Sequence, residues 1–116
     1  MRKDLRLRSP KLYKQVYAQG RSVHAEDLVL HFLYTETGEP ARVGLSVSKR
    51  VGNAVTRNRV KRRLRAVVAE VAGSLRPGSL LVLVAKPRAA TITFQDIKAS
   101  VLSLMARARA LEEGTR

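Results

Sequence analysis

Cysteine is absent from this chain of 116 residues, and histidine occurs only twice, at His24 and His31. The lack of cysteine excludes a disulfide framework and any metal site built from thiolates. A zinc site built on the two histidines would need further ligands at a suitable spacing, and none is evident. The sequence therefore predicts that the protein itself binds no metal and no other cofactor.

Long apolar runs are also missing. No stretch approaches the roughly 18 apolar residues of a membrane-spanning helix. The basic N-terminus, residues 1–6, is not followed by the apolar segment of a signal peptide. These absences predict a cytoplasmic protein without a membrane partner. Apolar residues still make up 45% of the chain, enough for one domain with a sizeable core.

Acidic residues are few. The chain has 9 Asp and Glu against 23 Lys and Arg, and its formal net charge at pH 7 is +14. Such an excess of one sign repels itself in a compact chain. The usual compensation is a polyanionic partner, which is a nucleic acid or, less often, an anionic membrane surface.

The positive charge is concentrated in one segment. No acid occurs between Glu39 and Glu70, whereas residues 49–65 include eight Lys or Arg. Apolar residues recur at helical spacing through the same segment, which a disordered basic tail would lack. Because Asn53 is a favourable N-cap, we predict a helix from Ala54 to about Ala72.

This predicted helix is amphipathic. Its apolar stripe consists of Val60, Leu64, Val67, Val68 and Val71. Its polar face carries Asn58, Arg62 and Arg65, flanked by Arg59 and Arg63. Solvated helix faces usually mix the two signs in spaced pairs, and this face does not. Since Arg outnumbers Lys and a guanidinium binds phosphate through two hydrogen bonds, the face is predicted to bind a polyanion.

Two further helices are indicated by their end signals. The first begins at Ser9 and Pro10, an N-cap followed by proline at the first helical position, and ends at Gly20. The last helix opens with Thr93 and Asp96, a pair that resembles a capping box. Both segments carry apolar residues at helical spacing, so each is predicted to pack one face on a core.

Strand-forming residues occupy the ranges 28–34, 42–48 and 80–85, with a further short strand near 21–23. In the second range, small side chains alternate with apolar ones and leave one face free for contact: Gly44, Ser46 and Ser48. The order helix, strand, strand, helix, strand, helix predicts an α+β or α/β fold. We expect a single sheet with its helices on one face.

Tyr13 and Tyr17 lie one helical turn apart. Aromatic stripes usually pack in the core, so a core position and a binding role are about equally supported. If Leu12 and Val16 fill the core instead, the two tyrosines form a platform for a single strand. Exposed rings and a free strand face fit RNA better than DNA, because a DNA-binding helix-turn-helix needs a helix, not a strand, before its recognition helix.

The sequence holds no arrangement of residues suited to catalysis. It has no phosphate-binding loop and no nucleophile elbow, and its acids are scattered. A nucleolytic pair formed by His24 and His31 is conceivable, but their placement gives it little support. We therefore predict a binding protein without catalytic residues of its own.

One long segment is similar to a known family. Residues 44–65 read GLSVSKRVGNAVTRNRVKRRLR, a run that resembles the signature of the bacterial ribonuclease P protein subunit. The early aromatic helix, the late buried strand followed by residues 86–90, and the closing amphipathic helix agree with this family. The resemblance thus covers nearly the whole chain and is most specific in residues 44–65.

The resemblance implies a protein partner of a catalytic RNA. Together they remove the 5′ leader of precursor transfer RNA by endonucleolytic hydrolysis, and the RNA carries the active site and its Mg²⁺. The protein would stabilise the RNA, hold the leader in a cleft and lower the Mg²⁺ requirement. The implied fold is an α–β sandwich with a left-handed parallel crossover through the basic helix, whereas about 98% of such crossovers are right-handed.

The length of the chain predicts a single RNA-binding domain, residues 1–116, and its tail at about 112–116 is predicted to fray. The resemblance also assigns roles to residues of this domain. The residues that would bind the catalytic RNA are Arg57, Asn58, Arg59, Lys61, Arg62 and Arg65. The residues that would line the leader cleft are Tyr13, Tyr17, His31, Ser46, Ser48, Lys49 and Arg50. His31 stands where the family often has an aromatic ring. The alternatives are a ribosomal protein or RNA chaperone and, with little support, a protein-only nuclease.

Overall fold

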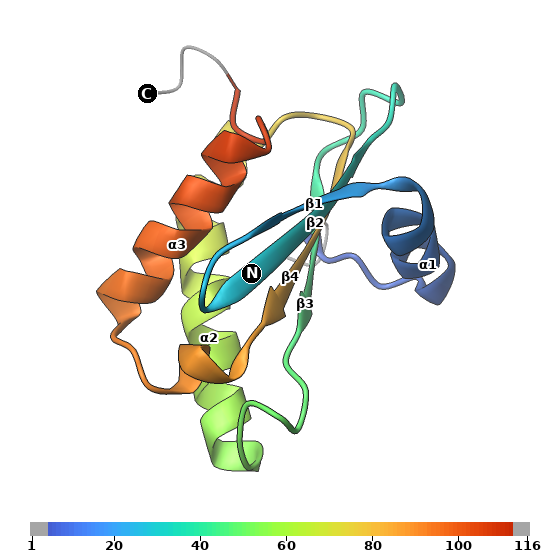
Figure 1. Ribbon diagram of the computed structural model, residues 1–116. Helices are drawn as coiled ribbons and strands as arrows, with labels where there is room; N and C mark the ends of the chain where they lie inside the picture. Colours follow the sequence, from blue (N-terminus) through green and yellow to red (C-terminus); the bar gives the residue numbers. More distant parts are fainter. Residues whose placement is uncertain (1–4, 113–116) are drawn as a thin grey trace.

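The computed structural model describes residues 5–112 (Figure 1). A single four-stranded sheet is flanked by three α-helices. In chain order the elements are α1 (Pro10–Gln19), β1 (Arg21–His24), β2 (Leu28–Tyr34), β3 (Arg42–Ser46), α2 (Ala54–Val71), the 3-10 turn η2 (Ala72–Ser74), β4 (Ser79–Ala85), the 3-10 turn η3 (Pro87–Ala90) and α3 (Phe94–Arg107). The α+β prediction is confirmed, including the short strand β1.

The three α-helices begin where their capping residues predict. The Ser9 hydroxyl accepts a hydrogen bond from the Leu12 N–H ahead of α1 (3.4 Å). The Asn53 side chain accepts one from the Thr56 N–H ahead of α2 (2.9 Å). Thr93 opens α3 with a complete capping box. Each cap satisfies a backbone donor that the first helical turn leaves without a partner.

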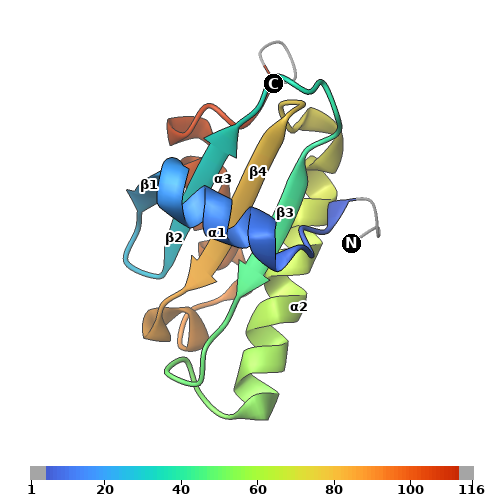
Figure 2. The same ribbon diagram turned by 90° about the vertical axis from the view of Figure 1, so that its right-hand side faces the viewer.

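The sheet is mixed, with strand order β1-β2-β4-β3. The β1–β2 and β2–β4 pairs are antiparallel, and β3 pairs with β4 in parallel. In Figure 2, β3 and β4 both run downward, β4 lies to the left of β3, and α2 joins them behind the sheet. This path is a left-handed crossover, as the family resemblance implies and against the general rule.

Helices cover both faces of the sheet, so the expectation of helices on one face is wrong. The larger core lies between the sheet and α2 with α3, while α1 crosses the other face (Figure 2). The reason is β4, which is apolar on both sides. Leu81 and Leu83 belong to the larger core, whereas Val82 faces α1 and packs in a smaller cluster with Val16.

The outer edge of β3 is extended by the segment that precedes α1. Arg6 forms a parallel bridge with Val43, and the Leu7 N–H donates to the Val43 carbonyl (3.0 Å). β3 itself ends at Ser46, two residues earlier than predicted. The chain turns there because the Val51 N–H donates to the carbonyl of Ser48 (3.1 Å).

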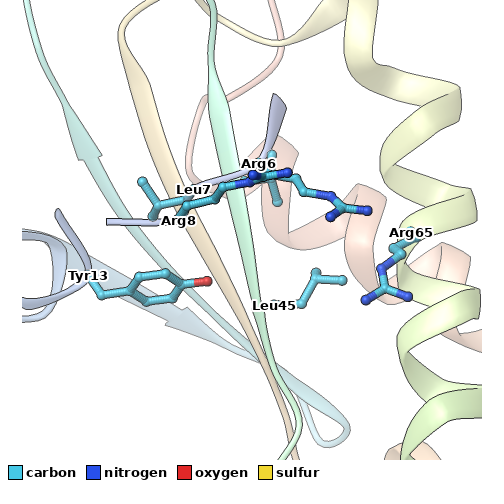
Figure 3. Close-up of a pocket in the computed structure, with 7 residues that line it drawn as sticks. Arg6, Leu7, Arg8, Tyr13, Leu45 and Arg65 are labelled. Atoms are coloured by element: carbon cyan, nitrogen blue, oxygen red, sulfur yellow. The ribbon is translucent and has the colours of Figure 1, made fainter. Parts of the chain in front are cut away.

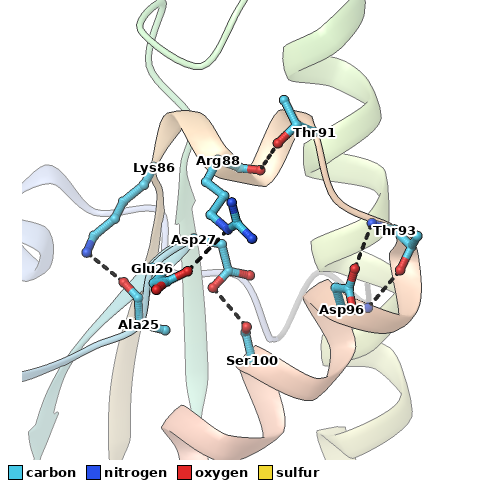
Figure 4. Close-up of polar contacts among 9 residues, drawn as sticks. All are labelled: Ala25, Glu26, Asp27, Lys86, Arg88, Thr91, Thr93, Asp96 and Ser100. Atoms are coloured by element: carbon cyan, nitrogen blue, oxygen red, sulfur yellow. Dashed lines mark hydrogen bonds and ion pairs between the residues drawn. The ribbon is translucent and has the colours of Figure 1, made fainter.

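Polar contacts connect the β1–β2 turn with η3 and α3 (Figure 4). The Lys86 ammonium donates to the Ala25 carbonyl (2.6 Å), and the Ser100 hydroxyl donates to the buried carboxylate of Asp27 (2.8 Å). The position of α3 is thus fixed through polar side chains as well as through the core.

The described part of the chain ends in an ordered contact. The Glu112 N–H donates to the Ser74 carbonyl (2.7 Å), so the backbone is anchored up to this residue. The remainder of the tail predicted at 112–116 lies outside the described residues. Among the helices described, none has the length and hydropathy that crossing a bilayer requires.

Candidate RNA-binding surface

Helix α2 has the two-sided character predicted for it. Val60, Leu64 and Val67 are fully buried against the sheet. Asn58 and Arg62 are exposed on the opposite side, and other predicted RNA-binding residues are half-buried: Arg57, Arg59, Lys61 and Arg65. The apolar stripe therefore fixes which face of the helix turns its cations outward.

Two arginines of α2 are used within the fold. A guanidinium N–H of Arg59 donates to the Ala90 carbonyl, and one of Arg63 donates to the Ile92 carbonyl, each at 3.0 Å. These bonds attach α2 to the last residue of η3 and to the segment between η3 and α3. Arg59 was predicted to bind RNA, and the structure gives it this additional, structural contact. The sequence carries no signal for it, because the acceptors are backbone carbonyls about 30 residues away.

Three rings from α1 and β2 form what we call the aromatic surface: Tyr13, Tyr17 and His31. The centroids of the two tyrosine rings lie 6.5 Å apart, and Tyr17 meets His31 edge-on at 4.8 Å. Val16 is 1% exposed and Tyr17 is 47% exposed. Leu12 and Val16 thus occupy the small core beneath α1, which leaves Tyr17 open to solvent.

The aromatic surface is uncharged at neutral pH. Partial burial raises the pKa of Tyr13 and Tyr17 above the ordinary tyrosine value. Partial burial, and to a smaller degree His24, lowers the pKa of His31 below its ordinary value. Neutral rings of this kind can stack on nucleobases without repelling the nearby guanidinium groups.

Gly44 allows Tyr13 to lie directly on β3. A Cβ atom at this position would collide with the Tyr13 hydroxyl and ring. The predicted free face of β3 is therefore covered by Tyr13 at Gly44. The same face is accessible to solvent again at half-buried Ser46 and exposed Ser48.

Lys49 and Arg50 are exposed in the turn between β3 and α2. The Arg50 N–H donates to the Ser48 hydroxyl oxygen (3.3 Å), which helps to shape this turn. The predicted cleft-edge residues thus lie on the connection from β3, on which Tyr13 rests, to α2.

A hollow of about 180 Å³ lies at the edge of the sheet, beside the predicted RNA-binding residues (Figure 3). It is lined by Arg6, Leu7, Arg8, Tyr13, Val43, Leu45 and Arg65. Sequence reasoning brought Tyr13 and Arg65 into the candidate site but missed Arg6 and Arg8. The alternation of Leu5, Arg6, Leu7 and Arg8 was the available signal, since it has the period of an extended strand.

The two histidines make separate contacts. His24 is exposed and lies 3.1 Å from the Ser22 hydroxyl, while His31 packs on Tyr17. Within residues 5–112, no group of three or more His, Cys, Asp or Glu side chains is placed to hold a metal ion. The groups gathered at the candidate site are guanidinium, phenol and imidazole.

Comparison with known proteins agrees with this arrangement. Residues 1–109 match the sequence profile of the family described as Ribonuclease P. The ribonuclease P protein component of Shouchella clausii is 39% identical, with 96% of this chain and 91% of the relative aligned. That of Symbiobacterium thermophilum is also 39% identical, with 97% of each chain aligned.

Solved structures similar to this fold come from the same family. The solved structure of the Staphylococcus aureus RNase P protein superposes with a TM-score of 0.86 at 25% identity, covering 95% of this chain and 100% of that one. Its likeness extends over the mixed sheet and the three helices. Profile, sequence relatives and fold agree over almost the full length, and the chain belongs to the bacterial ribonuclease P protein family.

Proposed function

We propose that this chain binds the catalytic RNA of ribonuclease P through the outward face of α2. We further propose that it holds the 5′ leader of precursor transfer RNA on the aromatic surface. As a ribonuclease P protein, the chain acts in transfer RNA processing. The hydrolysis itself, with its Mg²⁺, belongs in this proposal to the RNA partner.

The observation that carries the proposal is the division of α2 into a buried stripe and a cationic face. Val60 and Leu64 are fully buried, while Arg62 is exposed and forms no ion pair with an acidic residue among residues 5–112. Cations on such a face neutralise RNA phosphates and release condensed counterions. Binding should therefore weaken steeply as the salt concentration rises.

The aromatic surface supports the second half of the proposal. Tyr17 and His31 are uncharged rings on the face of the sheet that α1 crosses. Ser46 lies at the end of β3, two strands away from His31, and Ser48 lies in the turn that follows. Rings stack on bases of any identity, so this surface would retain a single strand with little reading of its sequence. A leader of variable sequence fits such a surface.

The chain would aid the reaction by electrostatics and positioning. Guanidinium groups close to the junction of leader and catalytic RNA would reduce repulsion between phosphates. Lower repulsion would let the substrate approach the catalytic RNA at a lower Mg²⁺ concentration. The side chains gathered here are suited to binding and orienting phosphates, and the RNA would supply the reacting centre.

Reconstitution tests the proposal directly. Cleavage of a precursor transfer RNA by bacterial ribonuclease P RNA is measured at low Mg²⁺ with and without this chain. We expect the chain to accelerate the removal of the leader, and an unchanged rate contradicts the proposal.

An RNA chaperone would bind RNA without accelerating this cleavage. A protein-only nuclease would cleave without the RNA partner and lose activity when His24 and His31 are both changed to Ala.

A further inference from the structure

We propose that the hollow at the edge of the sheet is a binding site for one RNA phosphate, formed by Arg6, Arg8 and Arg65. The inference deepens the proposed function and rests on it. Arg6 and Arg8 come from the segment before α1, and Arg65 comes from α2. The site therefore connects two parts of the chain that sequence reasoning treated separately.

The fold holds Arg6 and Arg8 in place. Leu5 and Leu7, which alternate with them, are each only 4% exposed. Leu7 is fixed to β3 by the hydrogen bond from its N–H to the Val43 carbonyl (3.0 Å). Because side chains of an extended segment alternate in direction, burial of Leu5 and Leu7 turns Arg6 and Arg8 to the other side.

Arg65 completes the cationic lining from the opposite direction. It stands on α2 one residue after Leu64, which is fully buried. Figure 3 shows its guanidinium extending from α2 toward Leu45 and the hollow. Among residues 5–112, no carboxylate pairs with Arg6, Arg8 or Arg65, and no hydrogen bond engages their guanidinium groups. Three such groups around one hollow repel one another unless an anion lies between them.

Tyr13 can supply a further hydrogen bond. Its ring and hydroxyl lie over Gly44, and Tyr13 lines the hollow. Burial raises the pKa of the Tyr13 phenol above its ordinary value, so the hydroxyl keeps a proton to donate at neutral pH. A phosphate oxygen in the hollow is a suitable acceptor for that proton.

The size and lining favour a single phosphate over a larger ligand. The hollow measures about 180 Å³, and three of the seven residues that line it are arginines. Several guanidinium groups around so small a space suit one anion that accepts a hydrogen bond from each. The hollow lies between Tyr13 of the aromatic surface and Arg65 of α2, where an RNA strand passing from one region to the other would place its backbone.

The test compares two double variants that each remove two positive charges. Arg6→Gln with Arg8→Gln alters the hollow. Arg21→Gln with Arg109→Gln is the control, because both of its residues are exposed and neither lines the hollow. Circular dichroism in sulfate establishes that both fold. The affinity of each for ribonuclease P RNA is then measured across a salt series, and inorganic phosphate is titrated while the arginine Nε–Hε signals are followed by NMR.

We expect the hollow variant to bind RNA about tenfold more weakly than the control variant. When log affinity is plotted against log salt concentration, the slope for the hollow variant should be shallower than that for the control variant by about 0.7–0.9. This difference is the value for one phosphate contact. In the unsubstituted chain, inorganic phosphate should shift the signals of Arg6, Arg8 and Arg65 together. The proposal is overturned if the two variants have equal affinity and equal salt dependence both for ribonuclease P RNA and, in the reconstituted holoenzyme, for leader-bearing transfer RNA. Phosphate binding that leaves these three signals unmoved also overturns it.

Two further arms identify the source of the phosphate. If it belongs to the leader, the hollow variant in the reconstituted holoenzyme loses affinity for leader-bearing but not leaderless transfer RNA. If it belongs to the catalytic RNA, the loss appears in the absence of any substrate. Both results support the site. Failure of the unsubstituted chain to accelerate cleavage would instead count against the proposed function, and the phosphate titration would still report on the hollow.

Discussion

At the scale of the residue, close contacts decide what a position tolerates. Gly44 illustrates this, since its lack of a side chain allows the ring of Tyr13 to rest on β3. Tyr13 in turn belongs both to the aromatic surface and to the wall of the hollow. A substitution at Gly44 should therefore displace Tyr13 and alter both the aromatic surface and the hollow.

Gly44→Ala should lower the free energy of unfolding by about 1–3 kcal/mol, because the added methyl group overpacks the contact with Tyr13. Urea denaturation measures the loss. Gly73→Ala is the control, since a Cβ there would meet no atom within 4 Å. In the double variant Gly44→Ala with Tyr13→Ala the two losses should be less than additive, because the clash is gone. Strict additivity would show that the two positions do not interact.

His31 should make the stability of the chain depend on pH. Burial lowers its pKa in the folded state below the value of about 6.5 that it has when unfolded. The unfolded chain therefore takes up a proton first, so the contribution of His31 is complete above about pH 6.5 and is lost as the pH falls through the folded-state pKa. His31→Phe should reduce the fall in stability between about pH 7 and about pH 5, measured by urea denaturation. The control variant His24→Gln should retain most of this fall in stability. Identical pH profiles for the unsubstituted chain and the two variants would show that His31 is not its source.

At the scale of the element, helix α2 combines two kinds of arginine only one position apart. Arg63 donates to the Ile92 carbonyl, whereas Arg62 is exposed. The first therefore joins elements of the fold, and the second is free to meet a partner. Neighbouring cations of the same helix thus differ in what their removal should change.

Arg63→Gln should lower the free energy of unfolding by about 1 kcal/mol, because one hydrogen bond between α2 and the η3–α3 segment is lost. Arg62→Gln, its neighbour, should leave the unfolding free energy nearly unchanged and reduce affinity for ribonuclease P RNA. Urea denaturation and a salt series of RNA binding measure the two effects. An equal loss of stability in Arg62→Gln and Arg63→Gln would refute the assignment of a structural role to Arg63 alone.

Helix α1 should act on the substrate more than on the catalytic RNA. Tyr17 is 47% exposed while Val16 beneath it is buried, so Tyr17→Ala removes a ring without opening the core. The reconstituted holoenzyme should lose about 1–3 kcal/mol of affinity for leader-bearing transfer RNA, the range for one stacked base. Leaderless mature transfer RNA, measured in parallel, should bind as before. Equal losses for both ligands would argue against a leader site on α1.

At the scale of the whole molecule, local signals predicted the elements but not all of their arrangement. Asn53 and Thr93 mark helix starts because capping depends on residues three positions apart, and such signals are readable in sequence. The placement of α1 on the second face of the sheet depends on packing between Val16 and Val82, which lie far apart in the chain. The left-handed crossover came from the family resemblance alone. Arg6 and Arg8 entered the site only because the segment that carries them pairs with β3.

The charge of the whole chain leads to a last prediction. A net charge of +14 destabilises the compact state by self-repulsion, and an anion that binds only the folded chain offsets it. Sodium sulfate should therefore raise the thermal midpoint, followed by circular dichroism, more than sodium chloride does at equal ionic strength.

Screening alone acts through ionic strength and would make the two salts equivalent. The same salts should weaken binding to RNA, because they compete for the cations that RNA neutralises. A rise in the midpoint that saturates with sulfate concentration identifies a bound anion, because exclusion of sulfate from the protein surface also strengthens folding but does not saturate. A thermal midpoint that follows ionic strength alone would instead assign the effect to the overall charge.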